Sequence, residues 1–169
     1  MPIDFFQEGK KYTSGKSLFG LCDDSVKGTR QHAYLDETTP NNWVAMVHNY
    51  LSKKIDFYAI DSCVKWSLSN GNQAKTCDGM LAFDSNKNII FVELKDQDTS
   101  YLSWKIKAEE QLKSTLDYFR NNHDTKGMTI KAYICNKQAL FDEGNPEYME
   151  KFKVETGVTL RVFREIHIK

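Results

Sequence analysis

Three charged residues in the middle of the chain have the types and spacing that could bind a divalent metal ion. Asp78 precedes one apolar segment, and Glu93 and Lys95 lie two positions apart at the end of the next. Residues two apart on a strand point to the same face, so Glu93 and Lys95 share a side. Carboxylate oxygens are the ligands that Mg²⁺ prefers, and one or two suffice when a substrate phosphate completes the shell. These residues therefore predict a magnesium site beside an ammonium group.

Two apolar strands must bring these residues together. The strands are expected over 77–83 and 88–94, joined by the polar run Asp-Ser-Asn-Lys-Asn. So short a connection implies an antiparallel hairpin, because parallel strands need a long crossover. The start of one strand then lies beside the end of its partner. Asp78 is therefore expected next to Glu93, despite the fourteen residues between them.

The remaining elements are expected around this hairpin from residue 39 onward. Thr39 as N-cap and Pro40 at the first helical position predict a helix over 40–53, with apolar residues at helical spacing. An apolar stripe predicts a second helix over 103–122. Other patterns predict strands over 55–61, 129–135 and 159–168, a turn at 69–73, and a short helix that begins with Asn145 as N-cap and Pro146 and ends before Gly157. Residues 1–38 show no sustained helical or strand periodicity in their apolar residues.

Asp78, followed by the triplet Glu93-Leu94-Lys95 after two apolar strands, resembles the signature of the PD-(D/E)xK nuclease superfamily. Its members share a core in which a helix precedes a three-stranded meander, followed by a helix and another strand. The expected order over 39–135 matches that core. The resemblance implies an α/β protein with a restriction-endonuclease-like αβββαβ core, a central mixed sheet flanked by helices, and a C-terminal helix and strand.

The resemblance also implies one nuclease-like domain over 1–169. No low-complexity linker or internal repeat divides the chain. Within the domain, we expect an N-terminal extension over 1–38, the core over 39–135 and a C-terminal addition over 136–169.

By the pattern of the superfamily, Asp78 and Glu93 would bind Mg²⁺ or Mn²⁺ together with the backbone carbonyl of Leu94. Lys95 would orient or deprotonate the attacking water and stabilise charge on the phosphate. Gln111, in the expected second helix, corresponds to a glutamine that faces the metal site in some branches.

Two positions depart from the pattern of those branches. The tyrosine expected four residues after the glutamine is Thr115 here, with Tyr118 displaced. Many members carry a glutamate in the first helix, which this chain lacks. Glu37, just upstream, is the candidate for an additional metal ligand.

Composition restricts the class of protein. The 169 residues include 23 Lys and Arg against 23 Asp and Glu, so the formal net charge is zero, which argues against nonspecific coating of nucleic acid. The 40% apolar share is typical of a globular domain. No apolar run reaches the roughly 20 residues of a membrane span, and we expect no signal peptide, no membrane partner and a cytoplasmic location. The cysteines lack paired spacing and are expected to be free, mostly buried thiols: Cys22, Cys63, Cys77 and Cys135.

The leading interpretation is a Mg²⁺-dependent endo- or exodeoxyribonuclease that hydrolyses phosphodiester bonds in nucleic acid, with DNA favoured over RNA. Analogy with small relatives suggests a role in bacterial defence or mobile-element biology, and leaves a homodimer or a protein partner open. The alternative is a non-catalytic binding module, such as an immunity or regulatory protein, that retains the nuclease-like fold. The zero net charge of the chain favours this alternative. A third reading is another metal-dependent hydrolase that acts on nucleotides.

Overall fold

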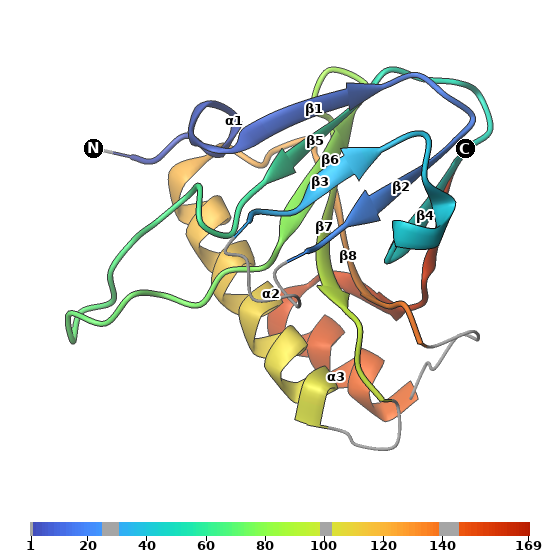
Figure 1. Cartoon of the computed structure of the whole chain (residues 1–169). Coiled ribbons are helices and arrows are strands. Elements are labelled where there is room, and N and C mark those ends of the chain that lie inside the picture. The colour runs from blue at the N-terminus through green and yellow to red at the C-terminus, as the bar shows by residue number, and fades with distance from the viewer. Residues whose placement is uncertain (1, 25–30, 99–102, 139–145) are drawn as a thin grey trace.

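A computed structural model describes residues 2–24, 31–98, 103–138 and 146–169 (Figure 1). In chain order, its elements are α1 (Phe5–Glu8), β1 (Lys10–Ser14), β2 (Leu18–Cys22), β3 (Tyr34–Asp36), the 3-10 helix η2 (Pro40–Asn42), β4 (Ala45–Asn49), β5 (Ile55–Ala59), β6 (Gly79–Phe83), β7 (Asn88–Lys95), α2 (Ser103–Asn122), β8 (Thr129–Asn136), α3 (Pro146–Thr156), β9 (Thr159–Val162) and β10 (Glu165–Ile168). They form a six-stranded sheet in the order β1-β5-β6-β7-β8-β9 and a four-stranded sheet in the order β10-β4-β2-β3. In the larger sheet β1, β5, β6 and β7 pair antiparallel, and β7, β8 and β9 pair parallel. The protein is therefore α/β with a mixed sheet, as predicted.

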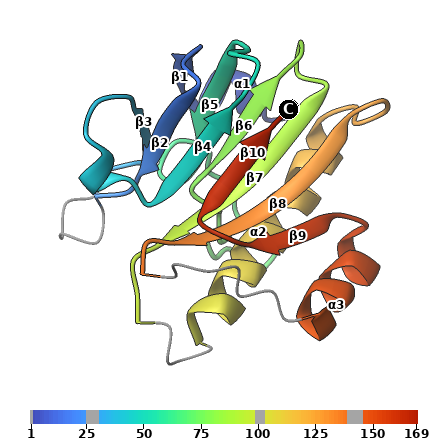
Figure 2. The same cartoon turned by 90° about the vertical axis from the view of Figure 1, so that its right-hand side faces the viewer.

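The six-stranded sheet is the middle layer of three. Its strands alternate, so that Phe91 packs toward α2 and α3 while Val92 packs toward the four-stranded sheet. Figures 1 and 2 show α2 and α3 together on one side of this sheet and the four-stranded sheet on the other. The helices that were expected to flank the sheet thus cover one of its faces, and a second sheet covers the other.

The predicted helix over 40–53 is wrong. Only the 3-10 turn Pro40–Asn42 forms there, Thr39 makes no side-chain cap, and the chain continues as β4. β4 buries Ala45, Val47 and Asn49 and turns the residues between them outward, which is the period of a strand. β2 and β10 pair with it on its two sides. These partners satisfy its backbone groups and outweigh the local helical spacing.

The expected final strand over 159–168 is divided between the two sheets. β9 pairs with β8 in the larger sheet, and β10 pairs with β4 in the smaller one. Arg164 lies at the bend, where Nε donates to the carbonyl of Val44 at 3.1 Å and Nη2 donates to that of Trp43 at 2.8 Å. These hydrogen bonds fix the bend between β9 and β10, so that one continuous segment contributes a strand to each sheet.

Other expectations match the structure closely. The helix at 103–122, the turn at 69–73 and the β6–β7 hairpin lie where predicted, α3 ends before Gly157, and all four cysteines are free, with three of them buried. Asn145, the predicted N-cap of α3, lies outside the described residues. Residues 1–38, in which no period was found, contribute strands to both sheets. Within the described ranges, no helix has the length and hydrophobicity needed to cross a membrane.

Candidate active site

The β6–β7 hairpin places Asp78 beside Glu93. Gly79 pairs with Val92 in the antiparallel register, so the residues just outside that pair meet. The amide of Asp78 donates to Oε2 of Glu93 at 3.1 Å, and the amide of Leu94 donates to Oδ2 of Asp78 at 2.6 Å. Each carboxylate is thus held by the backbone of the opposite strand.

Gly79 makes this close approach possible. A Cβ atom at this position would lie 2.4 Å from Cζ of Phe57 and 2.8 Å from the carbonyl oxygen of Tyr58, both on β5. The amide of Ile60, just after β5, donates to the carbonyl of Asp78 at 2.9 Å. A side chain after Asp78 would push β5 away, so the glycine keeps Asp78 tethered to both neighbouring strands.

Lys95 and Gln111 complete the cluster from β7 and α2. The Nζ atom of Lys95 lies 2.7 Å from Oε1 of Glu93 and donates to Oε1 of Gln111 at 3.1 Å. The side-chain amide of Gln111 donates in turn to the carbonyl of Thr76 at 3.0 Å. The four predicted site residues therefore form one continuous network, in which Gln111 connects α2 to the segment before β6.

Leu94 has its side chain on the opposite face of the sheet. It packs in the core between the two sheets, while Glu93 and Lys95 face α2. Its amide, already described, binds Asp78. The role of its carbonyl as a metal ligand stays a prediction.

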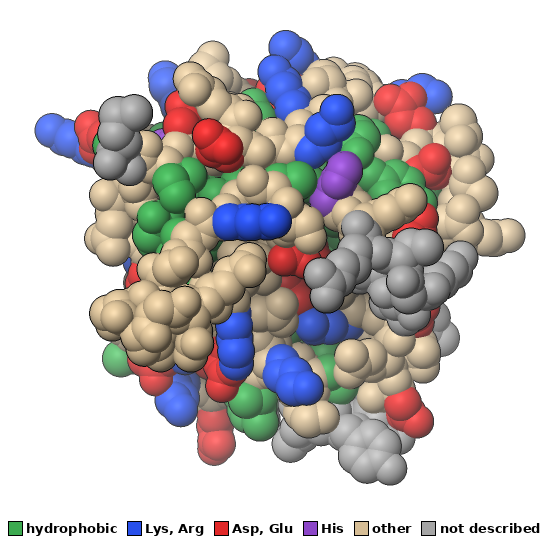
Figure 3. All heavy atoms as spheres, turned by 60° about the vertical axis from the view of Figure 1, so that its left-hand side comes forward, with side chains coloured by type: hydrophobic (Ala, Val, Ile, Leu, Met, Phe, Trp, Pro, Cys, Tyr) green, Lys and Arg blue, Asp and Glu red, His purple; other side chains and the backbone are tan. Residues whose placement is uncertain are grey.

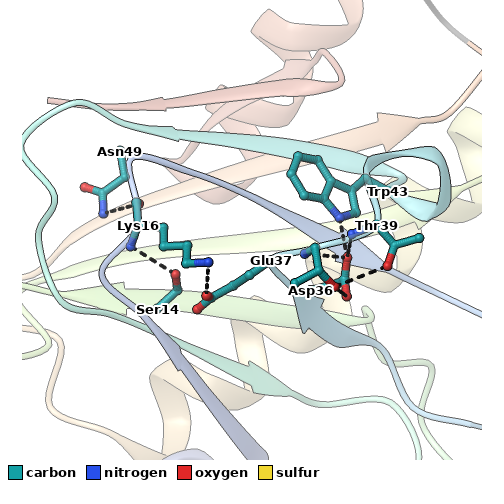
Figure 4. A network of polar contacts seen from close by, with 8 residues as sticks. Ser14, Lys16, Asp36, Glu37, Thr39, Trp43 and Asn49 are labelled. Atoms are coloured by element: carbon teal, nitrogen blue, oxygen red, sulfur yellow. Dashed lines mark hydrogen bonds and ion pairs between the residues drawn. The ribbon is translucent and has the colours of Figure 1, made fainter.

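The structure does not bring Glu37 to this cluster. Its carboxylate lies 3.0 Å from Nζ of Lys16 (Figure 4). It also interacts with the side chain of Ser14. Ser14 pairs with Ile55, which pairs with Phe83, at the end of the sheet opposite to Gly79. The structure therefore places Glu37, which was expected to be an additional metal ligand, at the opposite end of the sheet from Asp78 and Glu93.

Burial and nearby negative charges disfavour the ionised carboxylates. Asp78 is 7% exposed and Glu93 is 1% exposed. Burial and the charge of Glu93 raise the pKa of Asp78 well above its usual range. Burial raises the pKa of Glu93 to about 7, against the opposing effect of Lys95. Burial lowers the pKa of Lys95, but Glu93 outweighs this and holds it above its usual value. Lys95 is thus a stable cation beside Asp78 and Glu93, and its single positive charge does not fully offset the two carboxylates.

Two further acids lie near the cluster and were not predicted. Oδ1 of Asp61 accepts from the hydroxyl of Thr76 at 2.8 Å, and its charge raises the pKa of Glu93. The charge of Asp23, which directly follows β2, raises the pKa of Asp78. Asp61 ends the apolar segment before β6, which could have indicated it. No local pattern indicates Asp23, because β2 belongs to the other sheet.

Thr115, which stands where the resembled pattern has tyrosine, has a structural role. Its hydroxyl accepts from the amide of Cys77 at 2.8 Å and donates to the carbonyl of Gln111 at 2.8 Å. It therefore anchors the start of the hairpin to α2 next to Gln111. Tyr118 stacks on Trp66 at 4.1 Å between ring centroids and does not replace the missing tyrosine.

A pocket of about 350 Å³ opens beside Gln111. It is lined by Asp61, Ala74, Lys75, Thr76, Lys107 and Gln111. The two lysines could meet an anionic group there, although Lys75 also binds Glu110 at 2.7 Å. A substrate phosphate in this pocket would lie next to the glutamine that holds Lys95.

The donor set fits a hard divalent cation. Asp78 and Glu93 supply oxygen ligands from two adjacent strands, which is the chemistry that Mg²⁺ and Mn²⁺ bind. With Lys95 protonated and both acids ionised, the three groups sum to one negative charge before Asp61 and Asp23 are added. A divalent cation would offset this charge and favour the ionised carboxylates.

A second group of potential ligands was not predicted. His48, Glu165 and His167 have donor atoms within 4.8 Å of one another on the outer face of β4 and β10. The two imidazole rings lie nearly parallel, with 9° between their planes and 4.6 Å between centroids. A metal must lie in the plane of each ring, so these rings cannot share an ion without turning. Oε1 of Glu165 lies 3.1 Å from Nε2 of His48, which gives this group a role without a metal.

Comparison of the chain with protein-family models, curated proteins and solved structures finds no match.

Proposed function

We propose that this chain is a metal-dependent nuclease that hydrolyses phosphodiester bonds, with DNA as the first candidate substrate. One observation carries the proposal: Asp78, Glu93, Lys95 and Gln111 form a single hydrogen-bonded cluster beside a pocket. An ion pair for stability needs only one acid, whereas a second buried carboxylate costs free energy unless a cation offsets it. Buried titratable groups with perturbed pKa values next to a pocket are typical of functional sites.

The order of elements around the cluster supports the same proposal. β5, β6 and β7 form an antiparallel meander, α2 follows, and β8 returns parallel to β7. This βββαβ order agrees with the nuclease core that the motif resembles. We propose that the short α1 takes the place of the preceding helix.

In the proposed reaction, Asp78 and Glu93 would hold Mg²⁺ or Mn²⁺, and the carbonyl of Leu94 would be a further ligand. When bound, the ion supplies Lewis acidity toward water and neutralises charge on the phosphate. Lys95, held between Glu93 and Gln111, orients the attacking water and donates to a phosphate oxygen. Gln111 fixes the position of the ammonium group, because its own amide is held by the carbonyl of Thr76.

The direct test is incubation of the protein with linear, circular, single-stranded and branched DNA and with RNA. We expect cleavage of at least one DNA substrate with Mg²⁺ or Mn²⁺ and none with EDTA, read as products on a denaturing gel. Equal cleavage in EDTA would contradict the metal-dependent mechanism. Cleavage of RNA alone would support phosphodiester hydrolysis but would replace DNA with RNA as the substrate.

A non-catalytic binding module is the second candidate function. The face shown in Figure 3 carries Lys, Arg, Asp and Glu side chains interleaved, without a large area of one sign, and the net charge is zero. Both features favour this candidate. Calorimetric titration with Mn²⁺ separates the two, because a protein without catalysis has no reason to retain a metal site at Asp78 and Glu93.

We expect the affinity for Mg²⁺ to fall as the pH is lowered through 7. The pKa of Glu93 is raised to about 7, so the carboxylate is protonated below that pH and cannot bind a cation. At pH values between the usual pKa of a glutamate and about 7, Glu93 is protonated in the folded chain and ionised in the unfolded chain. The metal-free protein should therefore lose stability as the pH rises through that window.

Thermal unfolding at pH 5.5 and pH 8, with and without Mg²⁺, measures both effects. Stabilisation by Mg²⁺ should be large at pH 8 and small at pH 5.5. Glu93→Gln is the control, because it should lose most of this stabilisation at both pH values. Equal stabilisation of the unaltered protein at the two pH values would contradict the prediction.

A further inference from the structure

A second, larger groove lies at the opposite end of the molecule from Asp78. Its volume is about 1090 Å³, and it is bordered by the end of β4, the β6–β7 turn, β8, β9 and the end of β10. On β8 and β9, Ala132 and Leu160 pack toward the helices, so Lys131 and Arg161 face the other side. Figure 2 shows β10 crossing in front of the larger sheet, with β8 and β9 extending beyond it. The groove therefore lies along the β10 edge of the smaller sheet, over the part of the larger sheet that extends beyond it.

The lining of this groove is strongly basic. Of its residues in the described ranges, four are Lys or Arg and one, Asp84, is acidic: Lys53, Lys131, Arg161 and Lys169 are the bases. The Nζ atom of Lys53 lies 3.0 Å from Asp84, so that acid offsets only one of them. The lining therefore holds four basic side chains and one acidic side chain, in a chain whose net charge is zero. A concave surface of one sign concentrates an anionic ligand.

Aromatic rings line the same groove. The hydroxyl of Tyr50 lies 2.6 Å from Nδ1 of His167, and the two rings lie within 10° of parallel. A hydrogen bond to Nδ1 lies in the imidazole plane, so the two rings together form one extended flat surface. Tyr50 is 56% exposed, so the face of its ring is accessible from solvent. Tyr133 and Phe83 add aromatic area to the walls.

We propose that this groove binds a short single-stranded segment of nucleic acid. Phosphates would meet Lys131 and Arg161, and a base would stack on the surface formed by Tyr50 and His167. Cationic grooves that carry aromatic rings bind single strands without strict sequence preference, because every base has a flat face. The volume of about 1090 Å³ lies at the upper end of the range of about 300–1,000 Å³ for small-molecule pockets, so the groove has room for more than one nucleotide.

This binding site is distinct from the proposed cleavage site. Asn88 lines the groove, and Glu93 lies five residues further along β7, roughly 17 Å away at about 3.3 Å per residue. Lys131 also faces the side of the sheet opposite to Glu93. A strand in the groove therefore does not occupy the Asp78 cluster, and binding there does not depend on catalysis.

Fluorescence anisotropy with a labelled twelve-nucleotide oligothymidylate tests the proposal, in EDTA so that no cleavage occurs. We expect binding that weakens steeply between 50 and 200 mM salt, as phosphate contacts require. Lys131→Ala and Arg161→Ala should each weaken it several-fold, and together at least about tenfold. Tyr50→Ala should weaken it by about fivefold or more, consistent with about 1–3 kcal/mol for a stacked base. Lys151→Ala, an exposed lysine on α3, is the matched control and should bind like the unaltered protein.

Absence of binding, or equal binding by the Lys131, Arg161 and Tyr50 variants, would overturn the proposal. Competition by thymidine monophosphate at the same concentration as the oligonucleotide would assign the groove to a mononucleotide instead. Equal competition by polyglutamate would show that the groove binds acidic chains in general and would also overturn it. Binding is measured in EDTA, where the proposed cleavage does not occur, so failure of the nuclease proposal and failure of this one are distinguishable.

Discussion

Asp78→Asn is expected to reduce metal-dependent cleavage by about two orders of magnitude or more. The variant retains an oxygen that can accept from the amide of Leu94, so the local backbone contact can persist. It removes one of the two ionised ligands. Loss of one group that stabilises a transition state electrostatically typically lowers the reaction rate by a factor of roughly 10²–10³. Initial rates under saturating Mg²⁺ measure the change.

The same substitution should leave the metal-free protein folded and slightly more stable at pH 8. Burial and the charge of Glu93 raise the pKa of Asp78, so the ionised carboxylate is disfavoured in the folded state. Removing it should raise the free energy of unfolding by on the order of 1 kcal/mol, as is common when a functional site is neutralised. Asp117→Asn, an exposed acid on α2, is the matched control and should change neither property. Undiminished cleavage by Asp78→Asn would refute the assigned role.

Phe91→Ala is expected to produce the largest loss of stability. Phe91 is fully buried on β7, and its ring packs edge-to-face on Phe119 of α2 with 5.2 Å between centroids. Truncation of a buried phenylalanine leaves a cavity and costs about 3–5 kcal/mol. For a chain of this size, each kcal/mol lowers the melting temperature by roughly 2–4 °C. We therefore expect a fall of about 10 °C, measured by circular dichroism.

A substitution of an exposed apolar residue on α2 is the control for this prediction. Ile106 is 45% exposed, so Ile106→Ala should change the free energy of unfolding by about 0.5 kcal/mol or less. The contact between Phe91 and Phe119 joins the strand of Glu93 to the helix of Gln111. A Phe91→Ala protein with an unchanged melting temperature would show that this packing does not hold the two elements together.

Local sequence predicted the hairpin and α2 because their signals lie within each segment. The polar run between two apolar strands leaves only an antiparallel connection, and the register then follows from its length. The stripe along 103–122 is long enough to specify a helix without help from the rest of the chain. These two elements carry all four catalytic residues that were predicted, which is why the sequence located the cluster.

Long-range pairing explains where the predictions were wrong. The segment over 40–53 satisfies a helical and a strand period equally, and its partners β2 and β10 come from distant parts of the chain. The same pairing divides 159–168 between two sheets and carries Glu37 to the far edge. In each case the outcome depends on strands that come from distant parts of the chain.

The sequence by itself thus determined the chemical groups of the candidate site and the hairpin that joins Asp78 to Glu93, because turn length and strand period are local properties. The tertiary structure alone decided that Asp23 and Asp61 lie near those carboxylates and that Lys131, Arg161 and Tyr50 line one groove. The physical reason is that backbone hydrogen bonds of edge segments are satisfied by whichever strands reach them, and that choice depends on the whole chain.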